Sequence, residues 1–337
     1  MRVAAITITA ALLAGCATTP SGLPPVSVVA TGETEPVGTA NEDAADDPAI
    51  WRNPEDPAQS LIVATDKKAG LYVYGLDGKV RSFIDAGAVN NVDLVTLEDG
   101  TVFVAASDRI DLASSHISAF TLNTATGELT PLGRVPSGPG EGYGFCLSQH
   151  GSLTALAVIK DGRLREYEFA DWAPGEMPEA TLVREMSVPS QPEGCVYDER
   201  NGTLYVGEEV AGIWRFADGA TTGELVAPID NQYLVADVEG IAIAPSGEDG
   251  GYLVASSQGD NAYAVFRLPD MTPVGRFAIT AGIYGSTEET DGISLDTRSF
   301  GPDYPTGLFV AQDGINPPHA QNFKLVSWAA IRAALGL

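Results

Sequence analysis

Carboxylates recur at one position of a pattern that the sequence repeats six times, each time just before a short apolar segment. The copies start at Asp47, Asp93, Gly144, Glu193, Glu239 and Asp291, so five of the six carry a carboxylate there. Like charges that converge in space repel one another unless a cation binds among them. With three histidines and three cysteines in 337 residues, oxygen atoms are the available ligands, and they favour Ca²⁺ or Mg²⁺. Several carboxylates on one rim predict several ions.

A second position of the pattern is basic in the first three copies and acidic or amide-bearing in the last three. The basic residues are Lys67, Lys68, Arg109 and Lys160, and their counterparts are Glu208, Glu209, Gln258, Gln312 and Asp313. If these residues meet, one side of the site is cationic and the other is acidic. Metal ions beside Lys and Arg suit a multiply charged phosphate ester, and a water that bridges two metals would supply the nucleophile.

The spacing of the pattern predicts the elements that position these residues. Successive copies start 46 to 52 residues apart, and each contains short β-branched and aromatic runs such as 61–65 and 102–106. Six such units predict an all-β fold, a six-bladed β-propeller of four-stranded antiparallel blades. In a blade, the start of the first strand and the end of the second lie at the same mouth of the central channel. A propeller with ordinary polar turns is the alternative, because Asp and Gly are common at strand boundaries.

Both ends of the chain are expected to close the ring. The sixth copy has no sequence left for a regular fourth strand, and a strand-like segment at 26–30 precedes the first copy. We predict that this N-terminal strand joins the last blade. Because side chains alternate along a strand, the residues two positions after each start point the same way one layer deeper. They are Ala49, Val95, Cys146, Cys195, Ile241 and Ile293, which predict an apolar layer beneath the acidic rim.

The N-terminus resembles a bacterial export signal. Arg2 precedes an uncharged apolar run that is too short to span a bilayer and ends in Leu13-Ala14-Gly15-Cys16, which is similar to a lipobox. We predict a signal peptide at 1–15, lipidation of Cys16, a linker at 16–25 and a single propeller domain at 26–337. The protein would then be lipid-anchored in the cell envelope (periplasm or outer membrane) or secreted, and would touch a membrane only through the lipid. A plain cleaved signal with an incidental cysteine is the alternative.

Composition excludes several classes of function. The formal net charge of −26 argues against nucleic acid as a partner, because the phosphate backbone requires clustered Lys and Arg. After Cys16, only Cys146 and Cys195 remain, which is too few for a thiolate zinc cluster. The histidines are scattered, and Arg-His-Gly, Cys-x5-Arg, GxSxG and GxxxxGK[ST] motifs are absent from the sequence.

Motifs in every copy resemble the β-propeller phytases. The resemblance extends from about Asp43 to Trp328, and it is carried by Asp46-Asp47-Pro48-Ala49-Ile50-Trp51, Asp66-Lys67-Lys68, Asn90-Asn91-Val92-Asp93, Tyr143-Gly144-Phe145, Glu193-Gly194, Asp237-Val238-Glu239-Gly240, Ser257-Gln258-Gly259, Thr290-Asp291-Gly292 and Gln312-Asp313-Gly314. It implies a six-bladed fold and several calcium ions, and we expect a monomer. It also implies hydrolysis of phosphomonoesters of myo-inositol hexakisphosphate, that is, of phytate or calcium phytate.

The same resemblance implies roles for individual residues. Contacts to substrate phosphate would come from Lys67 or Lys68, Arg109, Tyr143 and Lys160. Ligands of calcium or of its bridging waters would be Asp46, Asp47, Asn91, Asp93, Glu193, Glu208, Asp237, Glu239, Gln258, Asp291 and Asp313. The residues implied to carry the reaction are Lys67, Arg109, Tyr143, Lys160, Glu193, Glu239 and Asp291.

Two features of the sequence need separate hypotheses. The family usually has a further Asp shortly before the Thr-Asp-Gly motif, where this chain reads Tyr284-Gly285-Ser286-Thr287. One calcium there would be lost, weakened or bound by Glu288 or Glu289. Cys146 and Cys195 fall in neighbouring copies, and an exported protein folds in an oxidising compartment. We hypothesise a disulfide between them, with two buried thiols as the alternative.

Two other functions are compatible with such a propeller. A calcium-dependent hydrolase such as a lactonase would centre on one ion with a histidine or carboxylate base, and it would leave the basic residues of the first three copies unexplained. A non-catalytic, lipid-anchored binding propeller is the second. Phosphate release from calcium-loaded phytate, with and without a chelator, distinguishes them.

Overall fold

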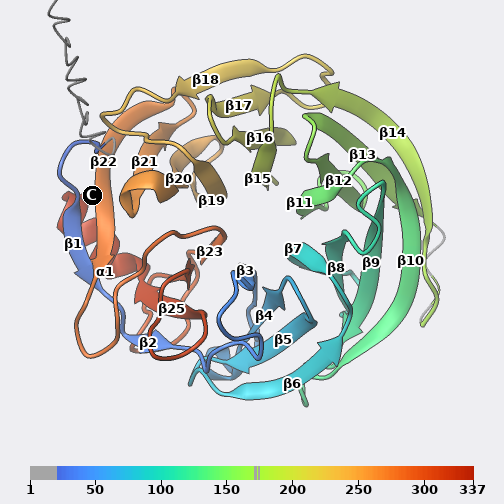
Figure 1. Cartoon of the computed structure of the whole chain (residues 1–337), viewed down its shortest axis with the longest axis horizontal. Coiled ribbons are helices and arrows are strands. Elements are labelled where there is room, and N and C mark those ends of the chain that lie inside the picture. Colours follow the sequence, from blue (N-terminus) through green and yellow to red (C-terminus); the bar gives the residue numbers. More distant parts are fainter. Residues whose placement is uncertain (1–20, 171–172, 174) are drawn as a thin grey trace, which may run out of the picture.

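The computed structural model describes residues 21–170, 173 and 175–337, whose strands form six β-sheets. The sheets are arranged as blades around a central channel (Figure 1), and the expected six-bladed β-propeller is confirmed. The expected signal peptide, Cys16 and the first part of the expected linker lie outside the described residues. In the described part of the chain, no helix has the length and apolarity that a bilayer crossing requires.

The first four blades each contain four antiparallel strands in chain order, with the first strand beside the channel and the fourth outermost. Blade one consists of β3 (Ala45–Trp51), β4 (Leu61–Asp66), β5 (Gly70–Gly75) and β6 (Val80–Asp85). Blade two consists of β7 (Val89–Thr96), β8 (Val102–Asp108), β9 (Ser114–Leu122) and β10 (Leu129–Pro139). Blade three consists of β11 (Gly142–Ser148), β12 (Thr154–Ile159), β13 (Arg163–Ala170) and β14 (Glu179–Ser187). Blade four consists of β15 (Pro192–Asp198), β16 (Thr203–Glu208), β17 (Gly212–Phe216) and β18 (Glu224–Pro228).

The N-terminal segment contributes to both of the last two blades. Blade five consists of β19 (Val238–Ser246), β20 (Gly250–Ser257), β21 (Ala262–Leu268) and β22 (Thr272–Thr280), and β1 (Val26–Val29) adds to β22 as a parallel fifth strand. Blade six consists of β23 (Ile293–Asp296), β24 (Leu308–Asp313) and β25 (Asn322–Ser327), and β2 (Gly32–Glu33) completes it antiparallel to β25. An N-terminal strand thus closes the last blade as expected, but it is β2, whereas the segment predicted for this role lies on blade five.

Short helices occupy three other places in the described part of the chain. Two single-turn 3₁₀ helices, at Pro57–Gln59 and Gln258–Asp260, follow β3 and β20. The helix α1 (Trp328–Leu335) ends the chain, and its buried Trp328 and Ile331 pack against blades five and six. The helix begins directly after β25, so it covers the edge at which the N-terminal strands enter.

Apolar side chains pack between neighbouring blades and so fix their angles. Between blades five and six, the rings of Phe277 and Phe309 lie with centroids 5.5 Å apart. Between blades one and two, Val63 and Val104 belong to one buried cluster. These contacts hold the first strands in a ring, which leaves their starts at a common mouth.

The first strands of blades one to five are distorted by a bulge where they reach this mouth. In blades one to five, the pairing register with the second strand jumps over two residues, which are Asp46–Asp47, Asn90–Asn91, Tyr143–Gly144, Glu193–Gly194 and Glu239–Gly240. In blade six, Asp291 and Gly292 precede β23 at the equivalent place. Bulges of this kind re-aim side chains next to active sites. The equivalent rim residues in blades one and two are therefore Asp46 and Asn90, and the predicted alignment on Asp47 and Asp93 was wrong.

Glycine at the second bulge position lets neighbouring blades approach closely. A Cβ added to Gly144 would lie 1.9 Å from the carbonyl oxygen of Glu193, and one added to Gly194 would lie 2.1 Å from that of Glu239. Only a residue without a side chain fits against a neighbouring backbone at this distance. The rim residues of blades three, four and five are thus held at a fixed short spacing.

The channel beneath the rim contains a cavity of about 730 Å³. Its wall combines the apolar residues Ile241, Ile293 and Leu147 with the carboxylates of Asp47 and Asp93. The expected apolar layer is thus interrupted by two acidic side chains, because the bulge shifts both of them below the rim.

Candidate active site

Two positions in each blade deliver side chains to the mouth. The rim residues are Asp46, Asn90, Tyr143, Glu193, Glu239 and Asp291. The residue that follows each second strand forms the other set, and in blades one to five it is Lys67, Arg109, Lys160, Glu209 and Gln258. The backbone N–H of each of these five donates to a carbonyl just before the first strand of the same blade, over 2.7 to 3.1 Å. This shared hydrogen bond defines the register and places Lys67 rather than Lys68, and Glu209 rather than Glu208, at the mouth.

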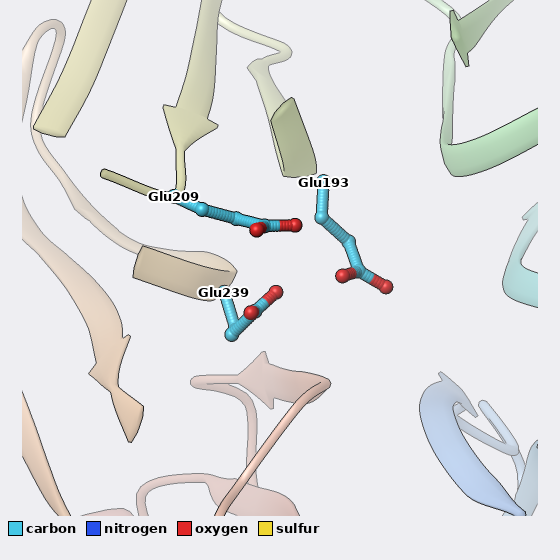
Figure 2. A group of neighbouring side chains, drawn as sticks. All are labelled: Glu193, Glu209 and Glu239. Carbon is cyan, nitrogen blue, oxygen red and sulfur yellow. The ribbon is translucent and has the colours of Figure 1, made fainter. Parts of the chain in front are cut away.

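Three glutamates from blades four and five form a compact acidic group. Ligand oxygens of Glu193, Glu209 and Glu239 all lie within 4.8 Å of one another, and their carboxylates point toward a common centre (Figure 2). The three residues are at most 9% exposed. Burial raises the pKa of Glu193 to about 7 and that of Glu209 to about 7, and burial with the nearby Glu193 carboxylate raises the pKa of Glu239 well above its ordinary value. Among the described residues, no hydrogen-bond donor reaches Oε2 of Glu239.

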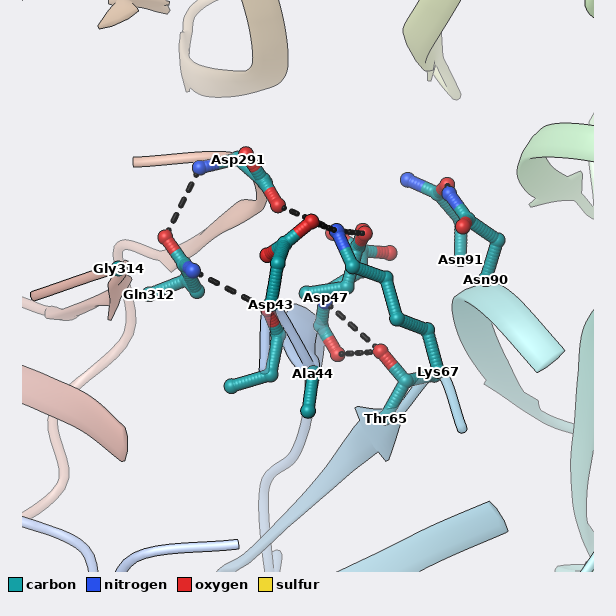
Figure 3. Close-up of polar contacts among 12 residues, drawn as sticks. Asp43, Ala44, Asp47, Thr65, Lys67, Asn90, Asn91, Asp291, Gln312 and Gly314 are labelled. Atoms are coloured by element: carbon teal, nitrogen blue, oxygen red, sulfur yellow. Dashed lines mark hydrogen bonds and ion pairs between the residues drawn. The ribbon is translucent and has the colours of Figure 1, made fainter. Parts of the chain in front are cut away.

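A second acidic group surrounds the ammonium of Lys67 (Figure 3). Its Nζ lies 2.8 Å from Asp43, 3.0 Å from Asp46 and 2.9 Å from Asp291. Burial, opposed by Lys67, raises the pKa of Asp46 and of Asp291 to about 7. Burial alone would lower the pKa of Lys67, but the three carboxylates raise it well above its ordinary value.

Amide side chains hold Asp291 in this group. Nε2 of Gln258 donates to Oδ1 of Asp291 over 2.6 Å, and the backbone N–H of Asp291 donates to Oε1 of Gln312 over 2.9 Å. Nε2 of Gln312 in turn donates to the carbonyl of Ala45 over 3.1 Å. Blades five, six and one are thus connected through Asp291.

The cationic side of the mouth is built around Tyr143. Nζ of Lys160 lies 4.6 Å from the centre of the Tyr143 ring, and Cζ of Arg109 lies 5.9 Å from it. Arg109 donates to Oδ1 of Asn90 over 2.8 Å and forms a 3.5 Å ion pair with Glu141, a residue that the sequence reasoning missed. Burial and the nearby Glu193 carboxylate raise the pKa of the Tyr143 hydroxyl, which is therefore a hydrogen-bond donor.

The two sides touch through Asn90. Its Nδ2 donates to Oε1 of Glu193 over 2.7 Å, while its Oδ1 accepts from Arg109. Arg109 and Lys160 thus face the glutamates as the two-sided arrangement predicts, but Lys67, predicted on the cationic side, lies among the carboxylates of Asp43, Asp46 and Asp291. A phosphate group at this mouth would have Arg109, Lys160 and the Tyr143 hydroxyl on one side and the glutamates on the other.

Comparison with known proteins places this chain in a family. The family model described as Phytase matches residues 2–337. The chain belongs to the phytase family. A 3-phytase of Bacillus subtilis (strain 168) is 39% identical over 330 residues, which cover 92% of this chain and 85% of that protein. Among solved structures, a calcium-binding regucalcin from Agrobacterium tumefaciens aligns with a TM-score of 0.55 and 16% identity over 90% of this chain and 97% of its own, a likeness that concerns the fold alone.

The donor set of this phytase fits calcium. Its acidic groups offer carboxylate and amide oxygens without histidine or thiolate, which are the ligands that Ca²⁺ prefers. Oxygens such as Oε2 of Glu239 and Oδ1 of Asp46 are buried without a hydrogen-bond partner in the described part of the chain. A buried carboxylate oxygen left without a partner is costly, and a bound cation would remove that cost.

Several residues that the resemblance implies as calcium ligands lie outside the two acidic groups at the mouth. Oε1 of Glu208 accepts from Ser190 and its Oε2 accepts from Trp214, so both oxygens of this buried side chain serve the fold. Oδ2 of Asp93 accepts from the backbone N–H of Leu147 over 2.8 Å, below the rim. Asp47 also lies below the rim, where its Oδ2 accepts from the N–H of Val92 over 3.1 Å.

The remaining implied residues are distributed over the mouth and its surroundings. Asn91 is buried beside Asn90. Asp237 is half-buried two residues before Glu239, and burial raises its pKa. Lys68 is exposed. Asp313 is buried, and its carboxylate lies 3.0 Å from Nζ of Lys324. Asp313 is therefore already paired with a lysine that the sequence reasoning did not consider.

The two cysteines that follow the rim are joined. Cys146 on β11 and Cys195 on β15 form a disulfide with their Cα atoms 5.9 Å apart. The hypothesis of two buried thiols does not describe this structure. The disulfide connects the first strands of blades three and four, directly beneath Tyr143 and Glu193.

Proposed function

We propose that this phytase-family chain releases inorganic phosphate from phytate at the mouth described above, and that the reaction depends on calcium. The family match and the 39% identical 3-phytase support the activity. The observation that carries the calcium dependence is the buried group of Glu193, Glu209 and Glu239, whose oxygens converge within 4.8 Å. Bound Ca²⁺ would neutralise phosphate oxygens and lower the pKa of an attacking water.

The residues of the chain would divide the work between them. Glu193, Glu209 and Glu239 would hold one calcium ion. Asp46, Asp291 and Asp43, which share the ammonium of Lys67, offer a second set of carboxylates. Arg109 and Lys160 would bind phosphate oxygens of the substrate, and the Tyr143 hydroxyl would donate to one of them. Asn90, which touches both Arg109 and Glu193, would fix the distance between substrate and metal. Asn91, Asp237 and Gln258 are further oxygen donors near this centre.

A chelator experiment tests the proposal. We expect the purified chain to release phosphate from phytate in the presence of calcium, to lose that activity in a chelator, and to regain it when calcium is added back. A matched assay with magnesium in place of calcium controls for non-specific charge neutralisation. Activity that survives complete calcium removal would contradict the mechanism, and absence of phosphate release at every calcium concentration would favour a binding propeller. Release of acid from a lactone without phosphate release would favour the lactonase alternative.

We also propose that the protein is exported and lipid-anchored through Cys16. The disulfide between Cys146 and Cys195 supports this, because disulfides persist mainly in oxidising compartments. Metabolic labelling with a radioactive fatty acid should mark the wild-type chain and leave the Cys16→Ser variant unlabelled. Equal labelling of both chains would exclude Cys16 as the anchor.

A further inference from the structure

The disulfide lies at the boundary between the two halves of the site. Cys146 follows Tyr143 by three residues on β11, and Cys195 follows Glu193 by two residues on β15. Tyr143 is flanked by Lys160 and Arg109, whereas Glu193 belongs to the acidic group of three glutamates. The covalent bond therefore connects the strand that carries the cationic centre to the strand that carries a proposed calcium ligand.

Two other pairs of neighbouring first strands near the mouth are connected by hydrogen bonds from a backbone N–H to a carboxylate. Asp47 of blade one accepts from the N–H of Val92 of blade two over 3.1 Å. Asp93 of blade two accepts from the N–H of Leu147 of blade three over 2.8 Å. At the next boundary, between blades three and four, the connection is the disulfide. The strongest link between adjacent first strands thus stands where Tyr143 and Glu193 have to be held together.

Backbone packing makes this boundary sensitive to small displacements. A Cβ added to Gly144 would lie 1.9 Å from the carbonyl oxygen of Glu193, so the two bulges lie in direct contact. Glu193 is also held from blade two, where Asn90 donates to its Oε1 over 2.7 Å. If blade four moved away from blade three, Glu193 would move with it and would lose both the contact with Gly144 and the hydrogen bond from Asn90 that fix its carboxylate.

We propose that the Cys146–Cys195 disulfide is a positioning element, which holds Glu193 against Tyr143 and thereby sets the calcium affinity of the three-glutamate group. This inference rests on the proposed function for the identity of the ion. The two cysteines do not touch the reacting atoms, and they act through the placement of Glu193. Groups that orient metal ligands from outside the coordination sphere typically change metal affinity by about 10- to 100-fold when they are removed.

Calcium binding by the substrate-free protein tests the inference. We expect the C146A/C195A variant to bind calcium about tenfold more weakly at its tightest site, as measured by competition with a chromophoric chelator. At saturating calcium, kcat should stay close to the wild-type value, because the reacting groups are intact once the ion is bound. Val254→Ala is the matched control, since Val254 is a buried residue of β20 in blade five and its truncation lowers stability without touching the mouth.

A reduction experiment covers the case in which the double variant does not fold. Dithiothreitol gives two electrons and two protons to the disulfide, which leaves Cys146 and Cys195 as thiols and the reagent as its cyclic disulfide. Reduced wild-type protein should show the same loss of calcium affinity, and the Val254→Ala protein without reductant should not. Cys146 and Cys195 line the cavity of about 730 Å³ in the channel, through which a small reductant can reach them.

The outcomes separate this inference from the proposed function. Wild-type calcium affinity in the double variant or in reduced protein, together with a lower melting temperature, would show that the disulfide is only structural and would overturn the inference. The inference would be supported if the double variant or the reduced protein bound calcium more weakly than Val254→Ala while both melted at the same temperature. A chain that binds calcium but never releases phosphate would overturn the proposed function while the calcium measurement still decides the role of the disulfide.

Discussion

The ammonium of Lys324 lies 3.0 Å from the carboxylate of Asp313 in the interior of blade six. Nζ of Lys324 also lies 2.7 Å from Glu33 on β2 and 2.9 Å from Oδ1 of Asn322, and the side chain is completely buried. Glu33 belongs to the short strand that closes the ring, so this lysine connects the N-terminal closing strand to the last blade. A Cβ added to Gly285 would lie 3.5 Å from Nζ of Lys324. Gly285 belongs to the segment in which the sequence lacks the expected Asp, so Lys324 lies beside that segment.

Loss of the Lys324 charge should destabilise the closed ring. Removal of one partner of a buried ion pair leaves an uncompensated charge, which costs about 3–5 kcal/mol. We therefore expect Lys324→Met to lower the free energy of unfolding by that amount, measured by urea denaturation at saturating calcium. Lys79→Met is the control, because the Lys79–Glu35 pair is exposed and such pairs contribute about 1 kcal/mol or less. Equal effects of the two substitutions would contradict the role assigned to Lys324.

Glu209 and Glu208 should respond differently to the same substitution. Glu209→Gln removes a charge from the three-glutamate group, so calcium affinity should fall by more than the roughly 10- to 100-fold that loss of an outer partner costs. Glu208→Gln keeps the shape of a side chain that accepts from Ser190 and Trp214, so it should lower stability and leave calcium affinity close to wild type. Calcium titration and thermal unfolding of both variants test this. If Glu208→Gln lost calcium binding and Glu209→Gln did not, Glu208 would be the calcium ligand, as the family resemblance implied.

The repeat made the fold and the two-sided site predictable. It did not reveal which residue of each first strand lies at the rim. The first strands are apolar runs of similar length, and the sequence does not show that two residues of each bulge lack a partner. Alignment by charge therefore selected Asp47 and Asp93, whereas the bulges place Asp46 and Asn90 at the rim. The sequence placed both Glu208 and Glu209 at the end of a predicted strand. Only the shared backbone hydrogen bond shows that Glu209 is the one at the mouth.

Contacts between distant segments account for the other differences. The segment 26–30 has a stronger strand signal than Gly32–Glu33, yet it pairs with β22, and the two-residue β2 closes blade six. Lys324 lies in an apolar strand, and its role depends on Glu33, which is 291 residues away in the sequence. A single sequence contains no local signal for such a contact.

Stability without calcium should depend on pH in an unusual direction. Burial raises the pKa of Asp46, Glu193, Glu209 and Asp291 to about 7 in the folded chain, whereas such groups titrate near about 4 when unfolded. The folded state then binds more protons, so the stability from these groups is complete below about pH 4 and is lost as the pH rises through about 7. We expect the melting temperature of calcium-free protein to be lower at about pH 8 than at about pH 5.

Calcium should reverse this pH dependence. The ion binds the deprotonated carboxylates, so its stabilising effect grows as the pH rises and the protons leave. The melting temperature should therefore increase more on calcium addition at about pH 8 than at about pH 5. Thermal unfolding at both pH values, with calcium or with chelator, measures the two effects. An equal calcium-induced increase at both values would show that the buried carboxylates are not the sites of binding.

The cationic side of the mouth should act on substrate and not on metal. Lys160 and Arg109 flank Tyr143, and Lys160 is also 3.9 Å from Glu141. A positioned cation at a phosphate is typically worth about 10²- to 10³-fold in rate, so Lys160→Met should lower kcat/KM for phytate by that factor. Lys160→Arg keeps the charge and should recover part of the loss, and calcium affinity should stay near wild type in both variants. A Lys160→Met protein with normal kcat/KM but weakened calcium binding would mean that this lysine serves the metal half, because a phosphate contact cannot be lost without a cost to turnover.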